Sequence, residues 1–359
     1  MRILALVTDA YGGYGGISQY NCDFCRALSQ SELIAEVVVL PRAGQAGALK
    51  LPAKVRQLPP QRNKFSYVAS ALRIAATSGP FDLIFCGHIH LIPLASMIGQ
   101  FLGQPVWLQT HGIEAWKRPR GPVRRQTQRA ALITTVSRHT RGKVLGWANI
   151  DPQRIRVLPN TVRPLFSPGK PSPETLAKFG LQGKTIILTV ARMGKADRYK
   201  GHDEVIAALP AVRSLYPDAC YVVAGEGDGR AGLEAIATEQ GLAQSVRFLG
   251  RLSDEDVLAL YRSAHVFIMP STKEGFGIVF VEAASTGLPV IAGNLDGSVD
   301  ALADGRIGQL VDPRSTDEIV SAIVAAISSQ QPVDARETQR FAFSNFAAHV
   351  HDLVNDLVH

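Results

Sequence analysis

The sequence repeats short apolar runs, each followed by a glycine-containing loop and then by a segment with helical spacing. Runs such as Ile3–Val7, Thr185–Val190 and Ala219–Ala224 are apolar at almost every position and rich in Val, Ile and Leu. This pattern is typical of strands that are buried on both faces of a parallel sheet. The alternation therefore predicts an α/β fold with parallel sheets. Similar runs lie at Glu36–Leu40, Asp82–Cys86, Pro105–Gln109, Ala131–Val136, Ile155–Leu158, Val246–Leu249, Val266–Pro270, Val290–Ala292 and Gly308–Val311.

A proline-rich segment interrupts the alternation once. Arg163–Pro173 contains four prolines, which is typical of a linker between domains. A chain of 359 residues is long enough for two cores. We therefore expect two doubly wound domains that face each other, at residues 1–163 and 164–340. Arg336–His359 has helical spacing, and we expect residues 341–359 to pack back against the first domain.

The composition is that of a globular protein, with 46% hydrophobic and 19% charged residues. No apolar run reaches the roughly 18 residues of a spanning helix. The chain enters its first strand at once, without the pattern of a signal peptide, so we expect a cytoplasmic protein.

The net charge of +7 is concentrated in one segment. Between Ala115 and Ile150 there is no acidic residue, and a solvated basic face, an anionic membrane, nucleic acid or a pyrophosphate substrate could each explain this. Only Trp116 and Trp147 interrupt the segment as aromatic residues, which argues against stacking on single-stranded nucleic acid. The nine basic residues are Lys117, Arg118, Arg120, Arg124, Arg125, Arg129, Arg138, Arg141 and Lys143.

Two patterns resemble metal sites, but each has a simpler interpretation. Cys22 and Cys25 lie on one face of an expected helix without a second cysteine pair, which favours buried free thiols over a metal or redox site. Asp254–Asp256 resembles a metal clamp, but Ser253 three residues before Asp256 favours a helix cap. We therefore predict no metal site and no cofactor.

Two loops have the features of phosphate-binding loops. Gly12–Gly16 follows the first strand and precedes a helix, so its amides could face phosphate, although a plain turn is the alternative. The next strand ends in Pro41-Arg42 rather than in an acid, which argues against a dinucleotide fold. Glu274–Glu282 also joins a strand to a helix, and its two carboxylates could hold two polar ends of one ligand. A corner with two solvated glutamates is the alternative there.

Taken in order, these motifs resemble the retaining glycosyltransferases of family four (group 1), which have the GT-B fold and include bacterial polysaccharide-assembly enzymes. The resemblance covers nearly the whole chain. It is carried by Gly15-Gly16, His111-Gly112, Arg192, Lys200-Gly201, Gly225-Glu226-Gly227 and Glu274-Gly275-Phe276-Gly277 with Glu282.

The resemblance implies a role for each matching position. Arg192 and Lys200 would bind the donor diphosphate, Glu274 and His111 the transferred sugar, Glu282 the ribose, and the backbone of Arg251-Leu252 the base. The implied catalytic residues are His111, Glu274, Arg192 and Lys200, and the implied donor-binding residues are Gly15, Gly16, Arg192, Lys200, Gly225, Arg251, Leu252, Glu274, Gly275, Phe276, Gly277, Ile278 and Glu282.

The implied reaction is metal-independent transfer, with retention, of a sugar from UDP or GDP to a glycan or lipid-linked acceptor. The acceptor belongs to the first half by this resemblance, so we expect the basic residues there to meet the acceptor or an anionic membrane at the inner face. The alternatives are an epimerase or phosphorylase on the same fold and a non-catalytic sugar-nucleotide-binding protein. The basic patch consists of Lys117, Arg118, Arg120, Arg124, Arg125 and Arg129.

Overall fold

The computed structural model describes residues 1–45, 50–61, 63–329 and 333–358. Contacts divide the chain into two compact units, one of Met1–Thr161 with Phe343–His359 and one of Val162–Ala342. These limits differ by two residues from the expected boundaries at 163 and 341. The Val162 N–H donates to Phe341 O at 3.0 Å, and Val162 pairs with Ala342. Because of this pairing, residues 162–163 and 341–342 belong to the second unit.

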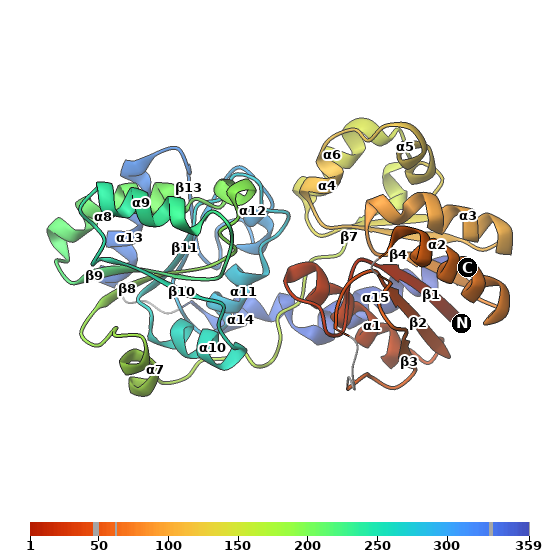
Figure 1. The fold of residues 1–359 in the computed structure, drawn as a ribbon, viewed down its shortest axis with the longest axis horizontal. Helices are drawn as coiled ribbons and strands as arrows, with labels where there is room; N and C mark the ends of the chain where they lie inside the picture. Colours follow the sequence, from red (N-terminus) through yellow and green to blue (C-terminus); the bar gives the residue numbers. More distant parts are fainter. Residues whose placement is uncertain (46–49, 62, 330–332, 359) are drawn as a thin grey trace. The chain divides into compact units, whose positions relative to one another are not determined.

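The N-terminal unit is built on a seven-stranded parallel sheet in the order β3-β2-β1-β4-β5-β6-β7 (Figure 1). Every residue of β4 and β5 is buried, as expected of strands covered on both faces. The strands are β1 (Arg2–Val7), β2 (Glu36–Pro41), β3 (Val55–Gln57), β4 (Leu83–Cys86), β5 (Val106–Thr110), β6 (Leu132–Thr135) and β7 (Ile155–Val157).

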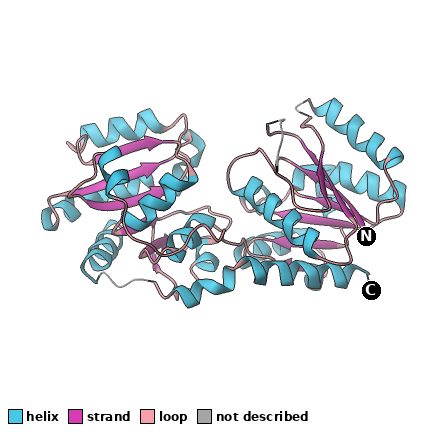
Figure 2. Cartoon of the chain, turned by 90° about the horizontal axis from the view of Figure 1, so that it is seen from below, coloured by secondary structure: helices cyan, strands magenta, loops and turns pink. Residues whose placement is uncertain are grey.

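Helices cover both faces of this sheet (Figure 2). The C-terminal helix α15 packs along α1, where His351 Nε2 lies 2.9 Å from Ala27 O and Val350 is fully buried. The helices of this unit are α1 (Gly16–Gln30), α2 (Lys64–Thr77), α3 (Ile92–Leu102), α4 (Ile113–Trp116), α5 (Gly121–Thr127), α6 (Arg138–Ala148) and α15 (Phe343–Val358), with 3-10 turns η1 (Ile89–Leu91) and η2 (Pro152–Arg154).

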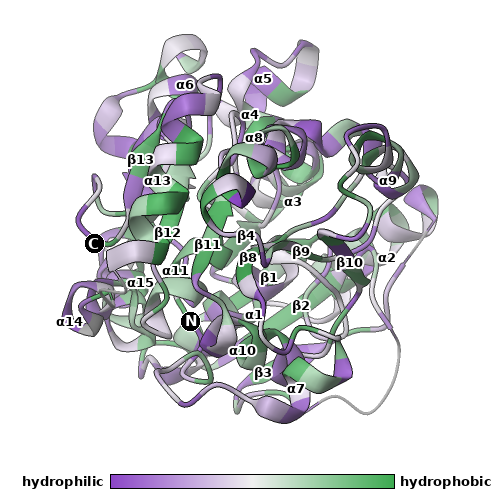
Figure 3. Cartoon of the chain, turned by 90° about the vertical axis from the view of Figure 1, so that its left-hand side faces the viewer, coloured by the Kyte–Doolittle hydropathy of each residue, from purple (hydrophilic) through white to green (hydrophobic). Residues whose placement is uncertain are grey.

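The C-terminal unit has a six-stranded parallel sheet in the order β10-β9-β8-β11-β12-β13. The central strands are coloured hydrophobic in Figure 3, in agreement with the full burial of β9 and β11. The strands are β8 (Thr185–Val190), β9 (Ala219–Ala224), β10 (Val246–Gly250), β11 (Val266–Met269), β12 (Val290–Gly293) and β13 (Gln309–Val311). The helices are α7 (Pro173–Lys178), α8 (His202–Leu215), α9 (Arg230–Glu239), α10 (Asp254–Ser263), α11 (Ile278–Ser285), α12 (Ser298–Ala301), α13 (Thr316–Ser329) and α14 (Ala335–Thr338), with 3-10 turns η3 (Lys195–Lys200) and η4 (Gln339–Phe341).

Each unit therefore has the doubly wound α/β architecture that the sequence predicts, with strand order reversing once in each sheet. The reversal falls between β1 and β4 in the N-terminal unit and between β8 and β11 in the C-terminal unit. Open α/β sheets bind ligands beyond the carboxyl ends of the strands at this position. The loops after these four strands are thus the first place to look for a site.

One expected helical segment is broken. The predicted helical segment Arg336–His359 is divided into α14, η4 and α15, because Ala342 adopts an extended conformation and pairs with Val162. His359, the last residue of that prediction, lies outside the described residues. Across the described part of the chain, no helix has both the length and the apolar character needed to cross a membrane.

Candidate active site

An ion pair lies at the strand-order reversal of the C-terminal unit. Lys200, which ends the turn after β8, donates from Nζ to Glu274 Oε2 at 2.6 Å, and Glu274 lies in the loop after β11. Their side chains are only 12% and 20% exposed. Within the described residues no group donates to Glu274 Oε1, so that oxygen can accept a hydrogen bond from a ligand.

Lys200 is held in place by the residue that follows it. Gly201 begins α8 with a φ of +85°, and a Cβ there would lie 2.6 Å from the carbonyl oxygen of Pro270. Only glycine allows the start of α8 to lie this close to the end of β11. The two halves of the ion pair are therefore brought together by direct contact between their loops.

The buried carboxylate of Asp296 fixes the loop that contains Glu274. Asp296 Oδ2 accepts from the Glu274 amide at 2.6 Å and from Ser271 Oγ at 2.8 Å, and Oδ1 accepts from the Ser298 amide at 2.9 Å. Burial raises the pKa of Asp296 from 3.8 to about 6. Asp296 thus fixes the backbone at Glu274.

Arg192 lies in the loop after β8 and extends its side chain into solvent, with 75% exposed. Asp197 Oδ1 lies 3.3 Å from its guanidinium. The loop itself is bonded to the loop after β9, since the Met193 amide donates to Glu226 O at 3.1 Å. Gly225 allows this approach, because a Cβ there would come within 2.0 Å of Ala191 O. Gly225 therefore acts by positioning Arg192.

A chain of buried polar groups continues from Arg192 into the core of the same unit. His202 Nε2 lies 3.4 Å from Arg192 O, and its Nδ1 lies 3.1 Å from the Tyr221 hydroxyl, which donates to Thr189 Oγ1 at 3.0 Å. Burial lowers the pKa of His202 to about 4, so the imidazole is neutral at pH 7. This network ties the Arg192 loop to α8, β9 and β8.

The remaining positions that the sequence predicts to bind the donor lie around α11 and the end of β10. Glu282 is buried inside α11, within 3.4 Å of the Tyr261 hydroxyl and 3.8 Å of an Arg163 guanidinium nitrogen. Phe276 is buried against Phe341, so only its amide can serve a ligand. Gly275, Gly277 and Ile278 form the entry to α11, and Arg251 and Leu252 follow β10.

The glycine loop of the N-terminal unit presents amides to solvent. Gly15 caps α1 with a φ of +88° and Gly16 is its first residue, and both are exposed. No atom lies within 4 Å of an added Cβ at either position. The positive end of the α1 dipole is therefore accessible to an anion.

His111 follows β5 and is fixed on both sides. Its Nε2 lies 3.0 Å from Gly87 O, and Glu114 accepts from the Gly112 amide at 3.2 Å and also from the His111 amide. Burial lowers the pKa of His111, so the imidazole is neutral at pH 7. A neutral ring that donates from Nε2 to a carbonyl has an acceptor at Nδ1.

The structure confirms two of the simpler interpretations. Ser253 accepts from the Asp256 amide at 3.1 Å as the cap of α10, and Asp254 pairs with Arg163 rather than gathering with its neighbours. All four cysteines are free thiols, but Cys22 is half-buried, so the prediction of burial holds for Cys25 and not for Cys22. In the described ranges, no group of three or more His, Cys, Asp or Glu side chains is placed to hold a metal ion.

Sequence reasoning missed three residues that position this site, namely Asp296, Asp197 and Glu114. Each acts on a neighbour through hydrogen bonds that depend on loop conformation, so the sequence carries little sign of them. Asp296 had the clearest signal, because it is an acid next to Gly297 after a buried strand.

Comparison with known proteins agrees with this geometry. The family described as "Glycosyl transferases group 1" matches residues 172–341, and "Glycosyltransferase Family 4" matches residues 14–164. The chain belongs to the group 1, family 4 glycosyltransferases. Its two parallel-sheet units are those of the GT-B fold.

Relatives and solved structures extend the comparison along the chain. A GDP-mannose-dependent alpha-(1-6)-phosphatidylinositol monomannoside mannosyltransferase of Mycobacterium tuberculosis is 26% identical over 341 residues, 90% of this chain and 88% of that protein. Its Mycolicibacterium smegmatis counterpart is 30% identical over 64% of this chain and 62% of that protein. Anabaena HepE in complex with UDP and glucose aligns with a TM-score of 0.79, 20% identity and coverage of 99% and 100%. Sucrose-phosphate synthase from Thermosynechococcus elongatus aligns at 0.80, 20% identity and coverage of 100% and 99%.

Proposed function

We propose that this protein is a retaining glycosyltransferase that moves a sugar from a nucleoside diphosphate to a glycan or lipid-linked acceptor. The observation that carries the proposal is the Lys200–Glu274 pair at the strand-order reversal of the C-terminal unit, beside the exposed Arg192. Lys200 can bind phosphate, and Glu274, which lies next to it, can accept hydrogen bonds from sugar hydroxyls. This is the pairing that a sugar diphosphate requires.

The two cations would act on the diphosphate. Negative charge builds on the leaving phosphate as its bond to the sugar breaks, and Arg192 and Lys200 can neutralise it through charge-assisted hydrogen bonds. The supply of two positive charges by side chains supports a metal-independent reaction. The acceptor oxygen forms the new bond on the face from which the diphosphate leaves, and its proton passes to the departing phosphate.

Glu274 and His111 would bind sugar hydroxyls. Glu274 Oε1 and the Nδ1 of neutral His111 are acceptors without a donor among the described residues. Glu282 would hold the ribose, the amides of Gly275–Gly277 would add donors for phosphate, and the backbone of Arg251-Leu252 would meet the base. Gly15 and Gly16 would contribute amides in the same way.

The relatives suggest which donors to test first. The mycobacterial relatives are named for GDP-mannose, and HepE was crystallised with UDP and glucose, so both bases belong in the panel. The names of the relatives also favour a glycolipid acceptor, and we infer action at the inner face of the cytoplasmic membrane in polysaccharide or glycolipid synthesis. An epimerase or phosphorylase would instead release an epimerised donor or use inorganic phosphate.

A donor titration tests the proposal. UDP- and GDP-linked sugars, beginning with GDP-mannose, are titrated by calorimetry against wild type and Lys200→Ala, and slow donor hydrolysis is followed by NMR. Loss of a charged hydrogen bond should weaken binding of the preferred donor by on the order of 10- to 100-fold. Lys184→Ala is the matched control, because this exposed lysine lies just before β8, at the opposite end of that strand from Arg192.

The titration distinguishes the proposal from its alternatives. Binding of one donor that is lost in Lys200→Ala and kept in Lys184→Ala supports the proposal, and an unchanged anomeric configuration in the product supports retention. Failure of every nucleotide sugar to bind wild type contradicts it. Binding without turnover on any acceptor would favour the non-catalytic alternative.

A further inference from the structure

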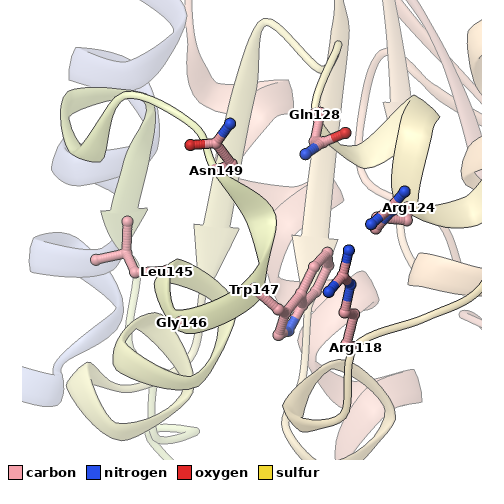
Figure 4. Close-up of a pocket in the computed structure, with 7 residues that line it drawn as sticks. All are labelled: Arg118, Arg124, Gln128, Leu145, Gly146, Trp147 and Asn149. Atoms are coloured by element: carbon pink, nitrogen blue, oxygen red, sulfur yellow. The ribbon is translucent and has the colours of Figure 1, made fainter.

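Charged side chains of this protein are balanced either by water or by a partner side chain. Arg118 and Arg124 line a hollow of about 440 Å³ between α5 and the C-terminal end of α6 (Figure 4), and Arg118 is exposed, so water solvates its charge. Glu282 inside α11 has no such access, because only 9% of its side chain is exposed. An ionised carboxylate that is buried to this extent needs partners within the protein.

Arg163 and Tyr261 contact the two oxygens of the Glu282 carboxylate. Nη2 of Arg163 lies 3.8 Å from Oε1, and the Tyr261 hydroxyl lies 3.4 Å from Oε2. Phe166 contacts both of these side chains, with its ring centroid 4.9 Å from the Arg163 guanidinium and 5.7 Å from that of Tyr261. Phe166 and Tyr261 are buried. The Glu282 carboxylate therefore has a neighbour at each oxygen, and packing fixes both neighbours.

Arg163 is held in turn by Asp254, the first residue of α10. Its Nη2 donates to Asp254 Oδ1 at 2.9 Å, and its Nη1 donates to Asp254 Oδ2. These hydrogen bonds lower the pKa of Asp254, and the bidentate pair fixes the plane of the guanidinium. Nη2 carries a second hydrogen, which can face Glu282. Because Asp254 closely follows Arg251-Leu252, one arginine links the segment proposed to meet the base to the carboxylate proposed to hold the ribose.

We propose that Arg163 is a positioning residue for nucleotide binding, and that through Glu282 it makes the site selective for ribonucleotides over 2′-deoxyribonucleotides. A carboxylate accepts hydrogen bonds from both hydroxyls of a ribose only when its two oxygens face them. Arg163 sets this orientation from the side of Oε1 and offsets the cost of the buried charge. The inference rests on the proposed function in one respect, that Glu282 holds the ribose of the donor.

Binding of ribonucleotides and 2′-deoxyribonucleotides tests the role of Arg163. UDP and GDP, each with its 2′-deoxy counterpart, are titrated by calorimetry against wild type, Arg163→Gln and Arg163→Lys. Loss of the charge beside Glu282 should weaken binding of the preferred ribonucleotide by about tenfold. The 2′-deoxy counterpart lacks one hydroxyl for Glu282, so its binding should weaken clearly less. Arg163→Lys keeps the charge without the planar fork that pairs with Asp254, so we expect an intermediate loss.

Lys178→Gln is the matched control. Lys178 on α7 donates from Nζ to Asp256 at 2.8 Å, so it is also a cation paired with the first turn of α10. Within the described part of the chain, Lys178 makes no ion pair with Glu282. Lys178→Gln should therefore leave the ratio between the ribonucleotide and 2′-deoxyribonucleotide affinities unchanged.

A double-mutant cycle shows whether Arg163 acts through Glu282. In the Glu282→Gln background, Arg163→Gln should weaken ribonucleotide binding little further, because the carboxylate that Arg163 positions is already gone. Thermal unfolding of each variant checks that it is folded. A purely structural role of Arg163 would weaken binding of both nucleotide forms alike and would add in full to the effect of Glu282→Gln.

Donor hydrolysis gives a second readout. The ribose lies away from the bond that breaks, so a contact to it binds the ground state and the transition state alike. Arg163→Gln should therefore raise the KM for the donor by about tenfold and change the rate at saturating donor little. A large fall in that rate with an unchanged KM would contradict the inference.

The outcomes separate this inference from the proposed function. Wild type that prefers the ribonucleotide, together with an Arg163→Gln variant that keeps the full preference, would overturn only the role of Arg163. Wild type that binds both nucleotide forms equally would overturn the selectivity, while the transferase proposal would stand. Wild type that binds no nucleotide would contradict the proposed function, and this inference with it.

Discussion

Asp296 connects the Lys200–Glu274 pair to the body of the C-terminal unit. Its carboxylate accepts a hydrogen bond from the Glu274 amide, and the Gly297 amide donates to Glu274 O at 2.9 Å. The loop before α12 therefore binds both the N–H and the C=O of Glu274. A residue outside the proposed binding set can therefore decide where the Glu274 carboxylate lies. We regard Asp296 as a positioning residue.

The raised pKa of Asp296 gives a pH dependence with a defined sign. Between its ordinary value of 3.8 and about 6, folded Asp296 binds a proton that the unfolded chain has released. Its ionisation therefore destabilises the fold, an effect that is absent below pH of about 3.8 and complete above about 6. Relative to Asp296→Asn, the unfolding free energy of wild type should fall by on the order of 3 kcal/mol as the pH rises through this window.

Urea unfolding of both proteins at several pH values checks this prediction. Groups far from Asp296 titrate alike in the two proteins, so the difference between their unfolding free energies reports on Asp296 and its immediate neighbours. A difference that stays constant across the window would mean that the carboxyl is not desolvated as described. Donor hydrolysis by Asp296→Asn should also be reduced, because an amide is a weaker acceptor for the Glu274 N–H.

The motif residues could be predicted from the sequence, whereas their supports could not. Lys200, Glu274 and Arg192 stand at recognisable spacings after predicted strands, and the structure places all three in the loops after β8 and β11. Glu114 and Asp296 act on backbone amides, and which amide an acid meets depends on how a loop turns. Local sequence does not determine that.

At the scale of elements, the loops of the C-terminal unit depend on glycines that allow close contact. Gly201→Ala would place a methyl group against Pro270 at a positive φ, so the start of α8 must move away from β11. We expect a loss of about 1–3 kcal/mol in unfolding free energy and a clear drop in donor hydrolysis, because Lys200 moves with it.

A second glycine provides the matched control for this substitution. Gly232 lies in α9, and nothing lies within 4 Å of a Cβ added there. Gly232→Ala should raise stability by roughly 0.5–1 kcal/mol through helix propensity and leave hydrolysis unchanged. Thermal unfolding and donor hydrolysis rates are measured for both variants. A change of the same sign in the stability of both variants would contradict the steric argument.

The strands were the most predictable elements because their burial leaves a continuous apolar run. Thr185–Val190 and Ala219–Ala224 agree with the prediction at both ends, whereas the three-residue β3 went unnoticed because only Val55 in it is buried. The break between α14 and α15 was missed for another reason. It is set by pairing with Val162, which is 180 residues away from Ala342.

At the scale of the whole molecule, position in the sequence does not decide which unit a residue stabilises. Phe346 and Val350 come from the end of the chain but are buried in the N-terminal unit, and the Tyr20 ring packs edge-on against Phe346 at 5.7 Å. The C-terminal unit has its own core around Ile323 and Val223. Each unit thus has the apolar interior needed for independent cooperative unfolding.

This organisation gives a prediction that the three tryptophans make measurable. Trp107, Trp116 and Trp147 all lie in the N-terminal unit, so their fluorescence reports on that unit alone. Val350→Ala should lower the midpoint of the fluorescence transition in urea, at a loss on the order of 2 kcal/mol, although residue 350 follows the whole C-terminal unit in sequence. Ile323→Ala should instead shift the circular dichroism transition and leave the fluorescence midpoint in place. If both variants shift both signals equally, the two units unfold as one cooperative body, and the assignment of α15 to the stability of the N-terminal unit alone would be wrong.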